Sequence, residues 1–157
     1  MTTRAIILRY ADYRERSRML TLLTEDGEKI SASVHGSKAY AEPFVCAELT
    51  LSVSGGRKYV KEGRTVAEFR GLRADIEKFQ LAAYIAGVVN ALADSDAPQP
   101  DLFRLCARAF DTLSKLDVTI DGLLDAFQNE FERRAAELAG FISFDEIRDL
   151  LTQREYW

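Results

Sequence analysis

The spacing of apolar residues changes once along this chain, and that change limits the folds open to it. Apolar and polar residues alternate at positions 29–35 and again at 45–53, which is typical of strands with one buried face. Beyond residue 74 the apolar residues instead recur every three or four positions, as they do along one side of a helix. The sequence therefore predicts an α+β chain in which strands come first and helices follow.

The first half contains enough short strands for a small barrel. Asp26-Gly27 and Gly55-Gly56 are typical of tight hairpin turns, because glycine adopts a positive φ without strain. Glu62-Gly63-Arg64 predicts an interruption of the last strand. Five antiparallel strands in about 70 residues predict a closed barrel, since closure leaves no exposed sheet edge. The expected strands are residues 5–10, 19–24, 29–35, 45–53 and 59–69.

The second half is typical of an α-helical bundle. Residues 81–89 are apolar on nearly every side, so we expect this helix to be buried among others, with close backbone packing at Gly87. Gly140 is expected to end the third helix, and Ser143 with Glu146 forms a capping box that begins a fourth. The expected helices are residues 76–89, 102–116, 120–138 and 144–153.

Charge is distributed unevenly along the chain, whose net charge is −4. Residues 1–73 hold 13 Lys and Arg against 9 Asp and Glu, a net +4, whereas residues 74–157 hold 8 against 16, a net −8. We therefore expect two domains, a basic barrel over residues 1–73 and an acidic α-helical domain over residues 74–157. The basic half could face phosphate groups while the acidic half faces solvent or protein.

Few residues are suited to catalysis or metal binding. His35 is the only histidine, and Cys46 and Cys106 are too far apart in the sequence to form a typical zinc pair. We therefore expect no enzyme activity, no metal and no cofactor. The chain has no apolar run of the ~20 residues that span a bilayer and no apolar leader. We expect a cytoplasmic protein with reduced cysteines and no membrane partner.

Several segments, taken in order, resemble the RecO family of bacterial recombination mediators. The first is RAIILRYADYRERSRMLTLLTEDGEKISASVHGSK, at residues 4–38. Within it, the positions that match the family's pattern are Tyr13, Glu15, Arg18, Thr24, Gly27 and Gly36. The other similar segments are Pro43-Phe44, Gly71-Leu72-Arg73 and AELAGFISFDEI at residues 136–147. The resemblance covers roughly residues 4–147 and rests on the order and spacing of these segments.

This resemblance implies that the barrel is an OB-fold and that the helices form the family's α-helical domain. Members of the family bind single- and double-stranded DNA, anneal complementary strands, and act with RecR and the single-strand-binding protein to load RecA. His35 and Ser37-Lys38-Ala39 stand where members often have consecutive basic residues, so we expect weaker DNA binding here. The chain ends at Trp157, ahead of the region with the zinc-binding cysteines of many members, so we expect a short form without zinc.

Two loops of the expected barrel carry the candidate nucleic-acid-binding residues. An OB barrel binds nucleic acid on one face and through the loops joining its first to second and fourth to fifth strands. Here those loops are residues 10–18 and 54–58, where basic side chains could contact phosphates and tyrosines could stack on bases. The competing interpretation is solubilising charge, with Asp12 and Glu15 pairing with some of the arginines. The candidate residues are Tyr13, Arg14, Arg16, Arg18, Lys38, Arg57 and Lys58.

We therefore expect a non-enzymatic accessory protein of DNA recombination and repair that binds single-stranded DNA weakly. The alternative is a RecO-derived protein-interaction adaptor that has lost DNA binding, which the acidic half and the depleted basic loop favour. The resemblance implies a RecR-like partner or one like the single-strand-binding protein. Self-association through the C-terminal helices is a further hypothesis, based on apolar Ile147, Leu150 and Leu151 and the terminal Tyr156-Trp157 pair.

Overall fold

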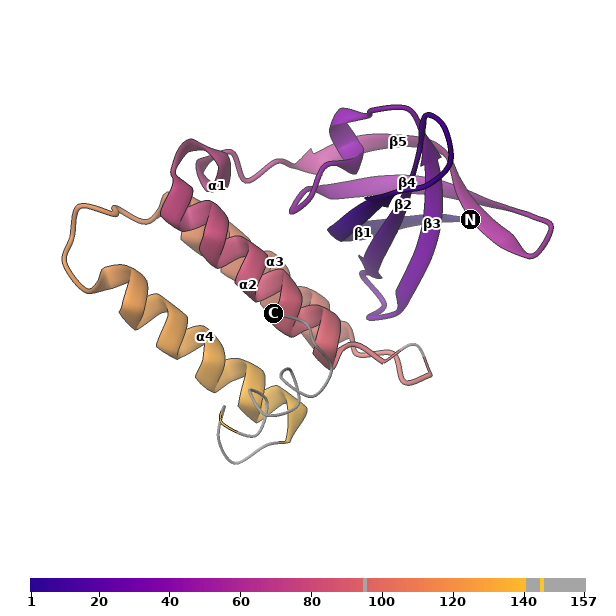
Figure 1. Ribbon diagram of the computed structural model, residues 1–157. Coiled ribbons are helices and arrows are strands. Elements are labelled where there is room, and N and C mark those ends of the chain that lie inside the picture. Colours follow the sequence, from indigo (N-terminus) through magenta and orange to yellow (C-terminus); the bar gives the residue numbers. More distant parts are fainter. Residues whose placement is uncertain (95, 141–144, 146–157) are drawn as a thin grey trace. The chain divides into compact units, whose positions relative to one another are not determined.

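The N-terminal part of the protein is a closed five-stranded barrel (Figure 1). The computed structural model describes residues 1–94, 96–140 and 145. The strands are β1 (Thr2–Asp12), β2 (Ser17–Thr24), β3 (Lys29–His35), β4 (Cys46–Ser54) and β5 (Arg57–Ala67), and they are hydrogen-bonded in the order β1-β2-β3-β5-β4. A short 3-10 helix, η1 (Ala39–Ala41), connects β3 to β4. The expected OB-fold barrel followed by helices is confirmed.

One pairing in the barrel is parallel, which corrects the expectation of a wholly antiparallel sheet. The pairs β1–β2, β2–β3, β1–β4 and β4–β5 are antiparallel, whereas β3 and β5 run parallel and pair at Ser33 and Tyr59. The reason is topological, since consecutive strands alternate in direction and the third and fifth therefore point the same way. Period-two spacing identifies strands but not their partners, so it could not predict this pairing.

β5 is continuous through Gly63, so the expected interruption there is wrong. The register of the β4–β5 pair shifts at two other places, between Thr50 and Leu51 and between Cys46 and Ala47 of β4. Gly63 meets a different requirement. A Cβ at this position would lie 2.8 Å from side-chain atoms of both Leu49 and Tyr40, so the glycine makes room for these two residues.

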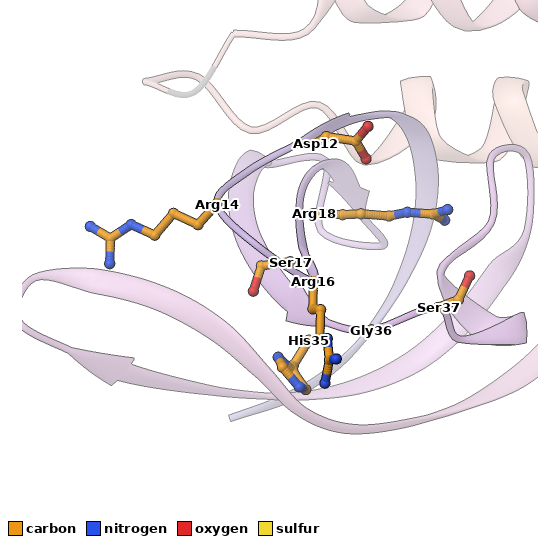
Figure 2. A pocket seen from close by; sticks show the side chains of 8 residues that line it. All are labelled: Asp12, Arg14, Arg16, Ser17, Arg18, His35, Gly36 and Ser37. Atoms are coloured by element: carbon orange, nitrogen blue, oxygen red, sulfur yellow. The ribbon is translucent and has the colours of Figure 1, made fainter.

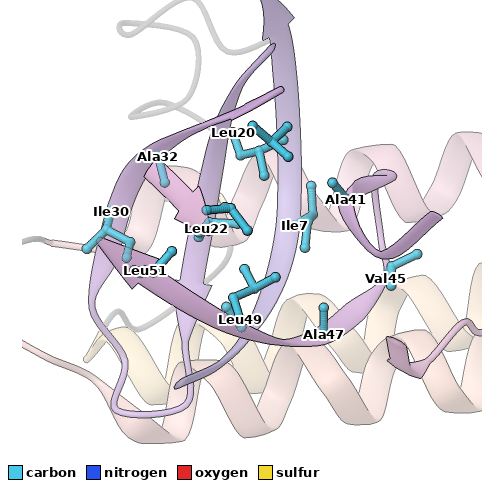
Figure 3. Close-up of a cluster of buried hydrophobic side chains, with 13 residues drawn as sticks. Ile7, Leu20, Leu22, Ile30, Ala32, Ala41, Val45, Ala47, Leu49 and Leu51 are labelled. Carbon is cyan, nitrogen blue, oxygen red and sulfur yellow. The ribbon is translucent and has the colours of Figure 1, made fainter. Parts of the chain in front are cut away.

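A cluster of buried apolar side chains fills the barrel (Figure 3). Ile7, Leu20, Leu22 and Leu49 are fully buried in it. Burying one such side chain stabilises the folded state by about 1.5–3 kcal/mol, so the cluster is the main source of the barrel's stability. The remaining members are Ala5, Ile30, Ala32, Val34, Ala41, Val45, Ala47, Leu51 and Val60, with Tyr40 packed against them.

The segment from Ala93 to Phe103 forms one compact unit with residues 1–68. The backbone N–H of Gln99 donates a 3.1 Å hydrogen bond to the carbonyl of Gly27, in the turn between β2 and β3. Gly27 has a φ of +85°, as the expected hairpin turn requires, and a Cβ on it would lie 2.0 Å from the carbonyl carbon of Gln99. The second unit comprises Phe69–Leu92 and the chain from Arg104 onward. The domain boundary expected at residue 73 stays a prediction.

Four helices are described after the barrel. They are α1 (Gly71–Ala74), α2 (Ile76–Leu92), α3 (Pro100–Lys115) and α4 (Leu123–Ala139). The helices expected at 76–89, 102–116 and 120–138 are confirmed apart from their ends, and the short α1 begins at Gly71-Leu72-Arg73, the segment that resembles the opening of the family's first helix. The fourth expected helix and its capping box, with the apolar residues behind the self-association hypothesis, lie outside the described residues.

Side chains and glycines near the helix ends account for the observed boundaries. Asp75 has an extended backbone, and its Oδ1 accepts hydrogen bonds of 2.9 and 3.1 Å from the N–H groups of Glu77 and Lys78 at the start of α2. Gly122 has a φ of +75°, which delays the start of α4 to Leu123. Gly140 ends α4 in the left-handed conformation, as the sequence predicts.

Buried polar side chains join the helices of the second unit. The Lys78 ammonium donates a 3.1 Å hydrogen bond to the carbonyl of Ser114, which links α2 to α3. Glu132 of α4 accepts hydrogen bonds from the Tyr84 hydroxyl of α2 and from Gln128. A buried polar group left without its partner costs about 1–3 kcal/mol, so these contacts help to specify which helices meet.

Neither a membrane-spanning helix nor a disulfide occurs among the described residues. In the part of the chain that the structure describes, no helix is long and apolar enough to cross a membrane. Cys46 and Cys106 are both buried, and no disulfide joins them. Burial raises the pKa of the Cys46 thiol, which favours its uncharged and less reactive form.

We expect the Gly27→Ala substitution to lower the free energy of unfolding by about 2–4 kcal/mol, because a left-handed alanine is strained and its Cβ collides with Gln99. Gly36→Ala is the matched control, since Gly36 has a φ of +74° but its Cβ would meet nothing within 4 Å. The free energy of unfolding of this control should fall by only about 1–2 kcal/mol. Urea denaturation of both variants measures the difference. Equal losses would mean that residues 93–103 do not pack against this turn.

Gly87 lies in the middle of α2, and the close packing expected there is not found: a Cβ would meet no described atom within 4 Å. We therefore expect Gly87→Ala to raise the free energy of unfolding by about 1 kcal/mol, the difference in helix propensity between the two residues. Chemical denaturation would measure this gain. A loss of stability would instead show that the position has no room for a methyl group.

Candidate nucleic-acid interface

The loop between β1 and β2 has a defined shape. The N–H of Tyr13 donates a 2.9 Å hydrogen bond to the carbonyl of Ser17, and the N–H of Gly36 donates one of 2.6 Å to the carbonyl of Arg16. Arg14 and Arg16 have φ values of 55° and 61°, in the left-handed region that residues other than glycine rarely adopt. The loop is therefore held in an unusual conformation by hydrogen bonds at both of its ends.

Tyr13 brings the two expected loops together. The guanidinium of Arg57, at the β4–β5 turn, donates a hydrogen bond to the Tyr13 hydroxyl and lies 5.8 Å from the centre of its ring. The guanidinium of Arg14 lies 5.2 Å from the same ring. Three of the candidate residues therefore share one contact site, which we call the Tyr13 cluster.

Arg18 occupies a different environment from the other arginines. Its side chain is 23% exposed and forms a 3.3 Å ion pair with Glu42, just after η1. Its guanidinium also lies 4.1 Å from the centre of the Tyr10 ring. The charge of Arg18 is thus largely compensated, and its contacts support the barrel wall more than they offer a cation to a ligand.

Neither candidate lysine makes a described contact with the Tyr13 cluster. Lys58 follows Arg57 directly in β5, and successive strand residues point to opposite faces, so the two side chains diverge. Lys38 is exposed immediately before η1, and its carbonyl accepts the N–H of Ala41. Tyr59, the residue after Lys58 in β5, is 39% exposed.

A depression of about 520 Å³ lies beside the first loop (Figure 2). Ser17 and His35 are opposite each other in the β2–β3 pair, so the loop and the end of β3 line the same hollow. Its lining residues are Asp12, Arg14, Arg16, Ser17, Arg18, His35, Gly36 and Ser37. Ser17 and Ser37 were not among the predicted site residues, and Ser17 enters the site because the observed β2–β3 register places it opposite His35.

The arrangement is suited to binding an anion. Guanidinium, imidazole and hydroxyl groups all donate hydrogen bonds, and a phosphate accepts several. Within residues 1–94 and 96–140, neither Asp12 nor Glu15 forms an ion pair with Arg14 or Arg16, so the pairing expected under the competing interpretation is not found for these two arginines. The positive charge of both arginines is therefore available to a ligand.

The helical unit carries a second concave surface, on which Arg134 is paired with Glu130. A groove of about 260 Å³ between α3 and α4 is lined by apolar and charged side chains. On α4, hydrogen bonds from Arg133 and Arg134 lower the pKa of the Glu130 carboxyl to about 2. The lining residues are Leu105, Arg108, Ala109, Thr112, Phe127, Glu130, Phe131 and Arg134.

Comparison with known proteins agrees with the resemblance found in the sequence. Residues 1–69 match the family model described as "Recombination protein O N terminal". The DNA repair protein RecO of Rubrobacter xylanophilus is 30% identical over 146 residues, which cover 88% of this chain and 57% of the relative. That of Geobacter metallireducens is 32% identical over 120 residues, which cover 72% and 49%.

The DNA repair protein RecO of Bacillus subtilis is 28% identical over 117 residues, which cover 70% of this chain and 46% of the relative. The chain thus spans about half the length of the curated relatives it matches. The family match covers the barrel, and the longest of these alignments extends well into the helices. Together these matches identify the chain as a RecO-like protein.

Proposed function

We propose that this chain is a non-enzymatic accessory protein of DNA recombination and repair that binds single-stranded DNA through the two basic loops of its barrel. The observation that carries the proposal is the contact between Arg57 and Tyr13, which joins loops 44 residues apart into one surface. The names of the relatives, DNA repair protein RecO, support the repair role. Partners like RecR and the single-strand-binding protein are proposed on the family resemblance alone.

The charges of this surface favour weak, salt-sensitive binding. Arg14, Arg16 and Arg57 are exposed, and the described contacts of Arg57 involve a neutral phenol rather than an acid. Arg18 adds little because Glu42 compensates its charge, and Lys38 makes no described contact with the Tyr13 cluster. Few phosphates would therefore be neutralised, and added salt competes directly with each such contact.

We expect the double substitution Arg14→Ala/Arg57→Ala to weaken binding of a labelled single-stranded oligonucleotide about 100-fold, since a hydrogen bond to a charged group contributes about 1.5 kcal/mol. Fluorescence anisotropy at low salt would measure this loss. The control is Arg133→Ala/Arg134→Ala, which removes the same charge from α4, where both arginines pair with Glu130. Equal losses in the two variants would show that net charge, and not the Tyr13 cluster, determines binding.

A second candidate function is that of a protein-interaction adaptor. The groove between α3 and α4 favours it, because Leu105, Phe127 and Phe131 offer apolar contacts beside the charged Arg108. An adaptor without DNA binding would give no anisotropy change with the wild-type protein, even at low salt. The arginine substitutions in the barrel would then leave partner binding unchanged.

A further inference from the structure

We propose that the depression beside the β1–β2 loop is a subsite for one phosphodiester of the bound strand, with Arg16 as its principal cation. The inference rests on the proposed function and assigns a specific role within it. Arg57 lies outside this depression, so the subsite is separate from the contact that joins the two loops. His35 and Ser37 belong to the subsite.

The backbone places these donors on one small surface. Ser17 pairs with His35, so Arg16 and Gly36 are the first residues beyond the last pair of the β2–β3 ladder. The hydrogen bond from the Gly36 N–H to the Arg16 carbonyl holds these two residues together. In Figure 2 the side chains of Arg16 and His35 point to the same side, and the guanidinium of Arg14 extends away from them.

The balance of charge in the depression is positive. Its cations are Arg14, Arg16 and Arg18, and its acid is Asp12. Arg18 is compensated by Glu42 at 3.3 Å, so Arg14 and Arg16 remain against the single carboxylate. Because the Arg14 side chain is directed away, an anion in the depression would meet Arg16 first (Figure 2).

The backbone of Arg16 supplies an independent argument. Its φ of 61° is easily adopted by glycine and is strained for arginine. A residue kept in such a conformation opposes folding, and such strain is concentrated at binding sites and active sites. A guanidinium that binds a ligand would explain why arginine, and not glycine, occupies this position.

The test therefore separates stability from binding. Arg16→Gly relieves the backbone strain and removes the cation, so its Tm should equal or exceed that of the wild type. For single-stranded DNA, the slope of log K against log salt concentration should be smaller in magnitude by about 0.7 than in the wild type, which is the contribution of one phosphate contact. Arg16→Lys retains the charge and should keep the wild-type slope. Arg133→Ala, which removes one charge from α4, should also leave the slope unchanged.

Each contrary result has a separate meaning. If wild-type protein binds no DNA at low salt, the proposed function fails. If wild-type protein binds and Arg16→Gly shows the same affinity and salt slope, the subsite assignment is wrong while the proposed function stands. Oligonucleotides with and without a 5′-phosphate complete the test. A change of slope seen only with the 5′-phosphorylated strand would overturn the assignment to an internal phosphodiester.

Discussion

The parallel pairing of β3 with β5 is the constraint on which the candidate site depends. Closing the barrel at Ser33 and Tyr59 places the start of β5 beside the second half of β3. The end of β3 is itself paired with the start of β2, where His35 lies opposite Ser17. The turn before β5 therefore comes within reach of the β1–β2 loop, and Arg57 meets Tyr13. Without this closure the two basic loops would be separate charged turns.

The barrel core makes that closure stable, and the loops can then tolerate strain. Fully buried side chains such as Ile7, Leu22 and Leu49 fill the interior. The loop outside them holds Arg14 and Arg16 in left-handed conformations. A strained loop is retained only where the surrounding structure determines its shape, and here two backbone hydrogen bonds do so. Stability in the core thus permits a fixed arrangement of cations at the surface.

Local sequence signals predicted the elements well because these signals act over few residues. The alternation at 29–35 gave β3 its observed bounds, and Gly27 and Gly140 have the positive φ values that their turn and helix end require. The direction of the β3–β5 pairing escaped prediction because it depends on which strands become neighbours across the whole barrel. Gly63 was misinterpreted for a similar reason, since the side chains it accommodates come from β4 and η1.

For the candidate site too, the sequence identified residues within each loop but not the contacts between residues that are far apart in the chain. Sequence reasoning identified Tyr13, Arg14 and Arg57, and the structure places them in contact. It could not predict that Arg18 would pair with Glu42, 24 residues away, which largely compensates the positive charge of Arg18. Nor could it place Lys58 on the face opposite Arg57 without the register of β5. The part these residues play in DNA binding stays a prediction.

The most direct test of the account is to map the DNA contact on the protein. Isotope-labelled protein titrated with a short single-stranded oligonucleotide, followed by amide chemical shifts, would locate the bound strand. The account predicts shifts concentrated at residues 13–18, 35–38 and 54–59, with α2 and α4 unchanged. Shifts concentrated on α3 and α4, with none at the barrel loops, would contradict it and would place the nucleic-acid surface on the helical unit.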